Sequence, residues 1–175
     1  MDDDNILTDA QLEMLVHGLE THPEIDLVAG WCDVAADVYA APRPMTSVGT
    51  FDARGRCVAF TAEELTKANG LVAIEWTGFP AVLMRGSLLA SLGAQAFRFI
   101  HDEINAPENG FFGEDVSFCK RMNVATSRPR MVVDTRVKVP HLKLRDANSG
   151  TSSLTASLNL PGAQQCPETV GQGKG

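Results

Sequence analysis

Three consecutive aspartates, Asp2, Asp3 and Asp4, follow the first methionine and are candidates for binding a metal ion. Hard divalent cations such as Mg2+ and Mn2+ prefer carboxylate oxygens as ligands. Two carboxylates separated by one residue at the end of a strand, as Asp2 and Asp4 are, can both point into one site. The alternative is an acidic tip that interacts favourably with the dipole of the helix that follows.

A second acidic pair lies in GEDVSFCKR, residues 113–121. Glu114 and Asp115 follow a glycine at the point where a helix is expected to begin. A carboxylate in this position could act as a general base toward a hydroxyl group. The alternative is that one of the two carboxylates caps the N-terminus of the helix.

A third group of polar residues lies in VDTRVKVPHLK, residues 133–143. His141 follows an expected strand and Pro140, and imidazole is a common ligand of transition metals. Lys143 and Arg145 stand just beyond it and could face phosphate oxygens. The alternative is an ordinary surface histidine at the end of a strand.

The fourth candidate is EWTGFP, residues 75–80. Gly78 permits a close approach of the backbone to a ligand. Trp76 and Phe79, on either side of Thr77 and Gly78, offer apolar or stacking surface. The alternative is a core strand followed by a turn.

The first element that could position these residues is a helix over residues 8–20. Thr8 and Gln11 have the spacing of a capping box, and leucine or valine at positions 12, 15, 16 and 19 forms one helical face. A buried strand is expected at 25–31, after Pro23. Further strands are expected at 56–60, 71–76, 81–84 and 131–139, helices at 86–92 and 115–124, and loops at 32–50 and 107–115.

The composition favours one globular α/β domain followed by a disordered tail. The chain has 175 residues, of which 44% are hydrophobic, and no run of about 18 apolar residues that would span a membrane. Residues 146–175 have no aromatic residue and are rich in Gly, Ser, Thr and Gln, so disorder is expected there. The N-terminus lacks the basic and apolar regions of a signal peptide, and the expected compartment is the cytoplasm.

The cysteines argue against a zinc-binding protein, and the charges argue against a protein that binds duplex DNA. Cys32, Cys57, Cys119 and Cys166 form no CxxC pair, which favours buried thiols over a zinc site. The net charge is −7, with eight acids and no Lys or Arg in residues 1–30, and six basic residues and one acid in 128–145. This separation suits a site that holds both a cation and an anion, and it does not suit duplex DNA.

The order of these motifs, from the aspartates through Thr-Gly-Phe and Gly-Glu-Asp to Val-Asp-x-x-Val-x-Val-x-His, resembles the GT-A glycosyltransferases, close to the family 2 pattern. The resemblance covers residues 2–143 and implies a Rossmann-like, nucleotide-diphospho-sugar transferase fold with a mixed sheet flanked by helices. It implies transfer of a sugar, with inversion, from a nucleotide-diphosphate sugar to a hydroxyl acceptor on a glycan, a protein or a small molecule.

The resemblance also assigns roles to individual residues. Asp2 and Asp4 would hold Mn2+ or Mg2+, with His141 completing the metal shell. Asp115 would deprotonate the acceptor hydroxyl, and Glu114 would support the acceptor. Trp76, Thr77 and Gly78 would form the loop that lines the pocket for the acceptor and the donor sugar.

One departure from the pattern concerns the nucleotide-binding half, which precedes the aspartate motif in GT-A enzymes. Only Met1 precedes Asp2 here, so residues 1–145 are expected to form the metal and acceptor side of the domain, with a partner chain supplying the other half. The alternative is a truncated, non-catalytic remnant that acts as a binding module, which an exposed apolar sheet edge would mark. A metal-dependent hydrolase is a third possibility, but a second cluster of ligands is missing from the sequence.

Overall fold

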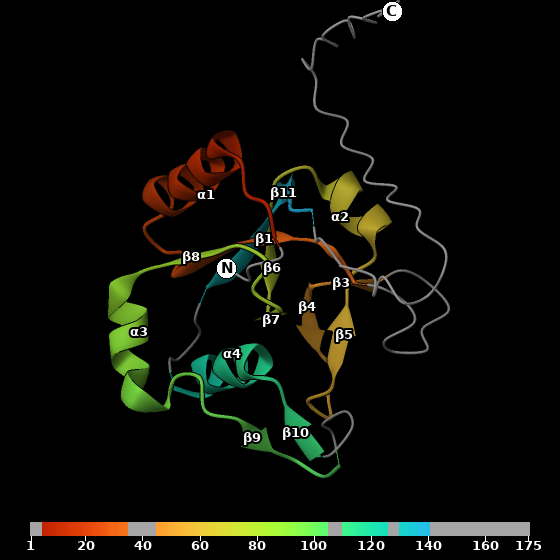
Figure 1. The fold of residues 1–175 in the computed structure, drawn as a ribbon, viewed down its shortest axis with the longest axis vertical. Helices are drawn as coiled ribbons and strands as arrows, with labels where there is room; N and C mark the ends of the chain where they lie inside the picture. Colours follow the sequence, from red (N-terminus) through yellow and green to blue (C-terminus); the bar gives the residue numbers. More distant parts are fainter. Residues whose placement is uncertain (1–4, 35–44, 105–109, 126–129, 141–175) are drawn as a thin grey trace, which may run out of the picture. The chain divides into compact units, whose positions relative to one another are not determined.

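The computed structural model describes residues 5–34, 45–104, 110–125 and 130–140. These residues all belong to the first of two units, residues 1–143 and 144–175, and they have a mixed α/β fold, as the sequence predicts (Figure 1). The predicted disordered tail at 146–175 lies outside the described residues. No helix in the described part of the chain is long and apolar enough to cross a membrane.

A four-stranded sheet forms the centre of the described unit. Its strands are β6 (Leu71–Ile74), β11 (Met131–Lys138), β1 (Leu27–Trp31) and β8 (Val82–Met84), in this spatial order. β1 and β11 are parallel, with Leu27 opposite Met131, whereas β8 and β6 are antiparallel to their neighbours. The four predicted strands in these regions are therefore confirmed, with shorter bounds.

Helix α1 (Asp9–Thr21) covers one face of this sheet. Its capping box is present: the Gln11 backbone N–H donates to Thr8 Oγ1 at 3.3 Å, and the Thr8 backbone N–H donates to Gln11 Oε1 at 3.0 Å. Leu15 packs with Val28 and Val137 in one buried cluster. The predicted helix at 8–20 is thus confirmed, and it packs against β1, β8 and β11 through Leu15 and Leu19, whereas Leu12 of the predicted apolar face is 44% exposed.

Helix α4 (Glu114–Ala125) brings its apolar side chains to the other main cluster of the core. Phe118 and Met122 are fully buried there with Leu27 and Val133. All five residues of β1 are buried, which explains the unbroken apolar run from 27 to 31.

Arg85 joins the end of α1 to the start of α3 (Gly86–Leu92). Its Nε donates to the backbone O of Ile25 at 2.8 Å, and one terminal nitrogen donates to the backbone O of Leu19 at 2.7 Å and of His22 at 3.3 Å. The last carbonyls of a helix have no partner within the helix. The guanidinium therefore supplies donors where α1 ends.

A second, three-stranded sheet has the order β5 (Cys57–Ala59), β4 (Val48–Phe51) and β7 (Trp76–Thr77). The loop predicted for 32–50 is wrong where the structure shows β2 (Asp33–Val34) paired with β3 (Met45–Thr46), and β4 directly after it. These strands are two to four residues long and gain their stability from partners elsewhere in the chain, so no local period marks them.

The remaining elements are a short strand pair beside α4, a helix beside β6 and β11, and a 3-10 helix after α3. The loop predicted for 107–115 is wrong at 111–112, where β10 (Phe111–Phe112) pairs with β9 (Ile100–His101), and α4 begins at Glu114. Helix α2 (Ala62–Ala68) has a capping box formed by Thr61 and Glu64 and lies between β5 and β6 in sequence. A short 3-10 helix, η2 (Gly93–Gln95), follows α3.

Candidate functional site

Asp115 lies in the first turn of α4 and is half-buried, whereas Glu114 beside it is exposed. The backbone N–H of Val116 donates to Asp115 Oδ1 at 2.6 Å. A Cβ atom at position 113 would stand 2.7 Å from the same oxygen, so Gly113 leaves the room that this carboxylate occupies. One oxygen of Asp115 is thus used within the helix turn.

The Thr-Gly-Phe segment is held beside the end of β1 through Ser47. The Gly78 N–H donates to the backbone O of Ser47 at 2.7 Å, and the Ser47 N–H donates to the backbone O of Cys32 at 3.0 Å. The Cys32 N–H in turn donates to Ser47 Oγ at 3.0 Å. Phe79 adopts a left-handed backbone with φ of 56°, which turns the chain sharply after Gly78.

Gly78 and Asp115 lie next to each other. A Cβ atom built at Gly78 would be 3.4 Å from Asp115 Oδ2 and 3.6 Å from the backbone O of Ser47. The Cys119 thiol, one turn further along α4, lies 3.9 Å from the backbone O of Thr77. Two motifs that stand 37 positions apart in the sequence therefore meet at one place in the fold.

Trp76 and Thr77 are buried, and their side chains contact protein groups. The Trp76 indole N–H donates to the backbone O of Thr50 at 2.9 Å, and Thr77 Oγ1 accepts from the N–H of Phe79 at 3.2 Å. The backbone of Gly78 lies beside Asp115, and the carbonyl of Thr77 lies beside the Cys119 thiol.

Three aromatic rings hold the Thr-Gly-Phe segment against α4. Phe79 meets Phe118 edge to face with a centroid separation of 5.3 Å, and Phe97 stacks on Phe118 at 4.9 Å. Edge-to-face and offset-stacked pairs stabilise a packed cluster beyond the area that they bury. The turn at Gly78 is thereby fixed to the middle of the same helix that carries Asp115.

The other candidate residues, Asp2, Asp4, His141, Lys143 and Arg145, lie outside the described residues. Their described neighbours in the sequence are adjacent in space: the Ile6 N–H donates to the backbone O of Pro140 at 3.3 Å. The Val139 N–H donates to the backbone O of Trp31 at 2.7 Å, at the carboxyl ends of β11 and β1. Within the described ranges, no three His, Cys, Asp or Glu side chains form a group that could hold a metal ion.

Two cysteines lie close to the site and remain protonated at neutral pH. Burial, with a smaller contribution from the charge of Asp115, raises the pKa of Cys57 to about 11, although Lys120 opposes the shift. Burial raises the pKa of Cys119 to about 12. Because the thiolate is the reactive form, these two thiols are packing groups and not nucleophiles.

Sequence reasoning missed Ser47, which connects the turn at Gly78 to the end of β1. A serine between a valine and a threonine carries no local signal of that role. Comparison with protein-family models, with curated proteins and with solved structures gives no match.

Proposed function

We propose that the chain is a metal-dependent glycosyltransferase, or the catalytic C-terminal half of one, with a partial GT-A fold. It would move a sugar from a nucleotide-diphosphate sugar to a hydroxyl acceptor. The observation that carries the proposal is the position of Asp115 Oδ2 beside Gly78, 3.4 Å from the point where a Cβ atom would stand. A carboxylate beside a backbone turn that has no side chain leaves space for an acceptor hydroxyl at hydrogen-bond distance.

In this proposal Asp115 accepts the proton of the acceptor hydroxyl as its oxygen attacks the anomeric carbon. The Val116 N–H donates to Oδ1, and Oδ2, on the side of Gly78, would accept the proton. A single attack from the side opposite the leaving group inverts the anomeric centre. Glu114, exposed beside the base, would hydrogen-bond the acceptor, and the backbone of Thr77 and Gly78 would line the sugar pocket.

The proposed metal ligands are Asp2, Asp4 and His141, a set of carboxylates and imidazole that suits Mn2+ or Mg2+ by the chemistry of its donors. A divalent cation there would neutralise the charge that develops on the departing diphosphate. Lys143 and Arg145 would add positive charge for the phosphates.

The arrangement of the main sheet supports this placement. In open α/β sheets, ligands bind outside the carboxyl ends of the parallel strands. β1 and β11 are the parallel pair, and the Ile6–Pro140 and Val139–Trp31 hydrogen bonds lie at that end. Asp4 precedes this contact by two residues and His141 follows it by one, which favours a common site.

The second candidate is a binding module that works with a partner chain, which would supply the nucleotide-binding half. The observation that favours it is the edge position of β8, which pairs along only one side with the strands that the structure describes. Its apolar residues Val82, Leu83 and Met84 are half-buried, and an open apolar edge can accept a further strand. The protonated thiols Cys57 and Cys119 are consistent with the cytoplasm as the proposed location of either candidate.

Thermal unfolding of the purified chain with Mn2+ and UDP, and then with Mn2+ and GDP, tests the first candidate. A ligand at about 100 times its dissociation constant adds roughly 2.7 kcal/mol to the folded state, which raises the unfolding midpoint clearly. We expect a shift that needs both metal and nucleotide and that disappears in Asp4→Ala. Asp9→Ala, an acidic residue five positions away on α1, is the matched control and should keep the shift.

A flat response from a cooperatively unfolding protein would contradict a donor site in this chain and favour the second candidate. That candidate would then be tested by Leu83→Lys, which places a charge on β8 and should weaken association with a partner chain.

A further inference from the structure

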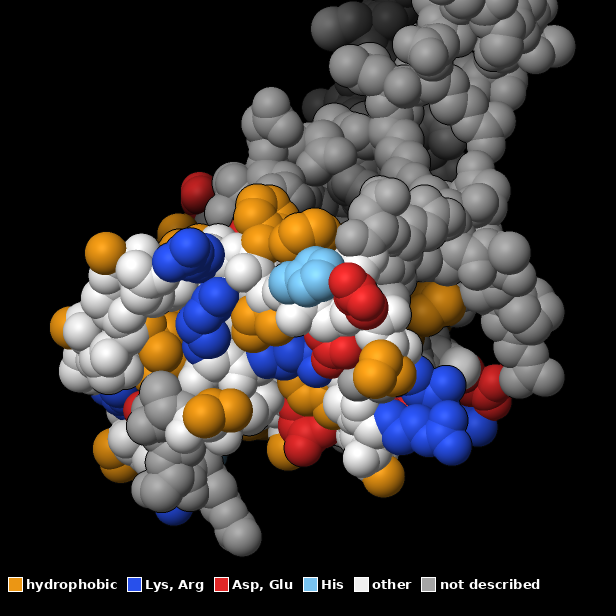
Figure 2. All heavy atoms as spheres, turned by 90° about the horizontal axis from the view of Figure 1, so that it is seen from below, with side chains coloured by type: hydrophobic (Ala, Val, Ile, Leu, Met, Phe, Trp, Pro, Cys, Tyr) orange, Lys and Arg blue, Asp and Glu red, His pale blue; other side chains and the backbone are white. Residues whose placement is uncertain are grey.

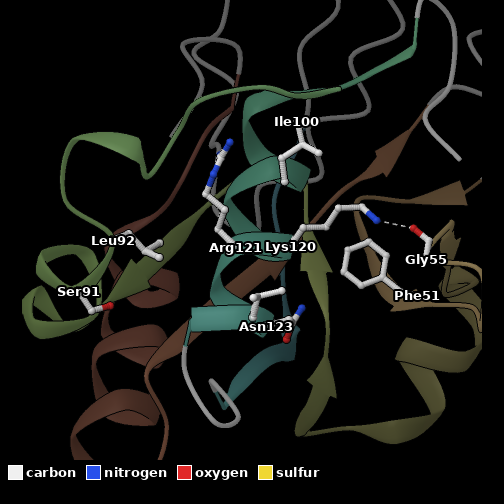
Figure 3. A pocket seen from close by; sticks show the side chains of 9 residues that line it. Phe51, Gly55, Ser91, Leu92, Ile100, Lys120, Arg121 and Asn123 are labelled. Atoms are coloured by element: carbon white, nitrogen blue, oxygen red, sulfur yellow. Dashed lines mark hydrogen bonds between the residues drawn. The ribbon is translucent and has the colours of Figure 1, made fainter. Parts of the chain in front are cut away.

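A groove of about 690 Å3 crosses the outer side of α4, between α3 and the turn that joins β4 to β5 (Figure 3). Its volume lies in the range of small-molecule sites, about 300–1,000 Å3. Its apolar wall comes from Phe51, Leu92, Ile100 and Val124, and its charged groups are Lys120 and Arg121. None of these residues belongs to the proposed transferase site.

The two cations leave α4 in different directions (Figure 3). Lys120 Nζ donates to the backbone O of Gly55 at 2.5 Å and lies 4.5 Å from the centre of the Phe51 ring. Arg121 donates to the backbone O of Ala96 and of Phe99, both at 3.4 Å. The long bonds of Arg121 leave its other N–H groups available to a ligand.

Neither cation has an acidic counter-ion among the residues that the structure describes. The described ion pairs involve other residues, and the printed contacts of the two cations are with backbone carbonyls and, for Lys120, with the rings of Phe51 and Phe112. Positive charge without a counter-ion at the edge of an apolar surface attracts an anion, and guanidinium binds phosphate through two parallel N–H groups.

The surface around the groove is unusually apolar for one that faces water. Val124 is 87% exposed on its rim, and Phe99 and Phe97 are 58% and 43% exposed nearby. Figure 2 shows hydrophobic side chains among basic and acidic ones on the side of the molecule where α4, β9 and β10 lie. Exposed apolar patches bordered by charge mark binding sites.

We propose that this groove binds one molecule of an amphiphilic anion. Its phosphate head group would pair with Arg121, and its hydrocarbon chain would lie along Leu92 and Val124. A nucleotide or a hydrophilic phosphate would leave the apolar wall in contact with water, and an uncharged detergent would leave the cations without a counter-ion. Only a ligand with both parts matches both features.

Isothermal titration with dodecyl phosphate, kept below its critical micelle concentration, tests the proposal. We expect saturable binding of one molecule per chain, and binding about tenfold weaker or worse for dodecyl maltoside, which has the chain without the charge, and for inorganic phosphate. Arg121→Gln should weaken the binding of dodecyl phosphate by about tenfold or more.

Val124→Asp should weaken it comparably, because it places a like charge in the groove. Val124 is almost fully exposed, so this substitution leaves the core intact and keeps the test valid even if Arg121→Gln fails to fold. Leu12→Asp, at an apolar position on α1 that is 44% exposed and outside the groove, is the control and should bind as the original chain does.

Three results would overturn the proposal. They are equal binding of dodecyl phosphate and dodecyl maltoside, no loss of affinity in Val124→Asp, or binding to anionic vesicles with none to the monomeric amphiphile. The last result would assign the patch to a membrane surface instead.

Discussion

The carboxylate of Asp115 lies against the backbone of Gly78, so that a Cβ atom at position 78 would stand 3.4 Å from Oδ2. This distance is an ordinary van der Waals contact, so an alanine fits without displacing the helix. Its methyl group would occupy the space that the proposed acceptor hydroxyl needs. We expect Gly78→Ala to unfold within about 2 °C of the original chain and to lose about 100-fold in transfer rate.

Gly86→Ala, where a Cβ atom would meet nothing within 4 Å, is the matched control and should keep full activity. Unchanged transfer in Gly78→Ala would place the acceptor elsewhere.

Asp115→Asn removes the proposed base but keeps an oxygen that can accept from the Val116 N–H. We expect turnover to fall by about 10²–10⁴-fold with little change in stability, because a general base contributes about that much. Glu114→Gln, on the exposed neighbour, should have a smaller effect and raise KM for the acceptor more than it lowers kcat. Equal losses in both variants would mean that Asp115 is not the base.

Gly49→Ala should destabilise the fold severely. A Cβ atom there would lie 2.0 Å from the backbone O of Val58, inside the pairing of β4 with β5, so the two strands would have to separate. We expect a loss of about 2–4 kcal/mol in the free energy of unfolding, measured by urea denaturation. A loss below about 0.5 kcal/mol would show that this strand pair does not form as described.

On β11 the buried carboxylate of Asp134 pairs with Arg136, whose side chain is 46% exposed. Arg136 Nε and one terminal nitrogen donate to the two oxygens of Asp134 at 2.8 and 2.6 Å, and the Asp134 side chain is 0% exposed. Arg136→Met leaves that buried carboxylate without its cation, and we expect a loss of about 1–3 kcal/mol in urea denaturation. Lys67→Met breaks the exposed pair with Glu63 and should cost no more than about 0.5 kcal/mol.

The buried thiols should make the protein less stable in alkali. The pKa of Cys57 rises from 9.0 to about 11 and that of Cys119 from 9.0 to about 12 on folding, so the unfolded chain releases these protons first. The contribution of these two thiols to the free energy of unfolding should therefore be constant below pH 9 and decrease as the pH rises from 9 through 11. Urea denaturation between pH 8 and 11 measures the slope, and Cys57→Ser with Cys119→Ala should flatten it; an equal slope would assign the loss to other groups.

The elements that the sequence predicts correctly are those whose signals are local. The capping box at Thr8 and Gln11 and the leucine spacing of α1 fall within four turns of one helix. β1 is an unbroken apolar run because both of its faces are covered. By contrast, β4 contains Gly49 and pairs with β5 and β7, and nothing within residues 48–51 reveals those partners.

The candidate site likewise has a part that the sequence predicts and a part that only the fold shows. The sequence alone predicts an acidic helix start after a glycine at residues 113–115. The proximity of Asp115 to Gly78 is a tertiary contact, which only the fold shows. Ser47 could not be found, because its role depends on two backbone hydrogen bonds, from Gly78 and to Cys32.

The indole N–H of Trp31 donates to the backbone O of Thr135 at 2.9 Å, across 104 residues of chain. β1 and β11 must find each other over this separation, and parallel pairing of distant segments is the slow step of sheet formation. On the ribosome, at about 5–20 residues per second, β1 would wait several seconds for β11 to be synthesised. During that interval its apolar edge is open to aggregation, so the yield of folded protein should depend on how well chaperones cover residues 27–31.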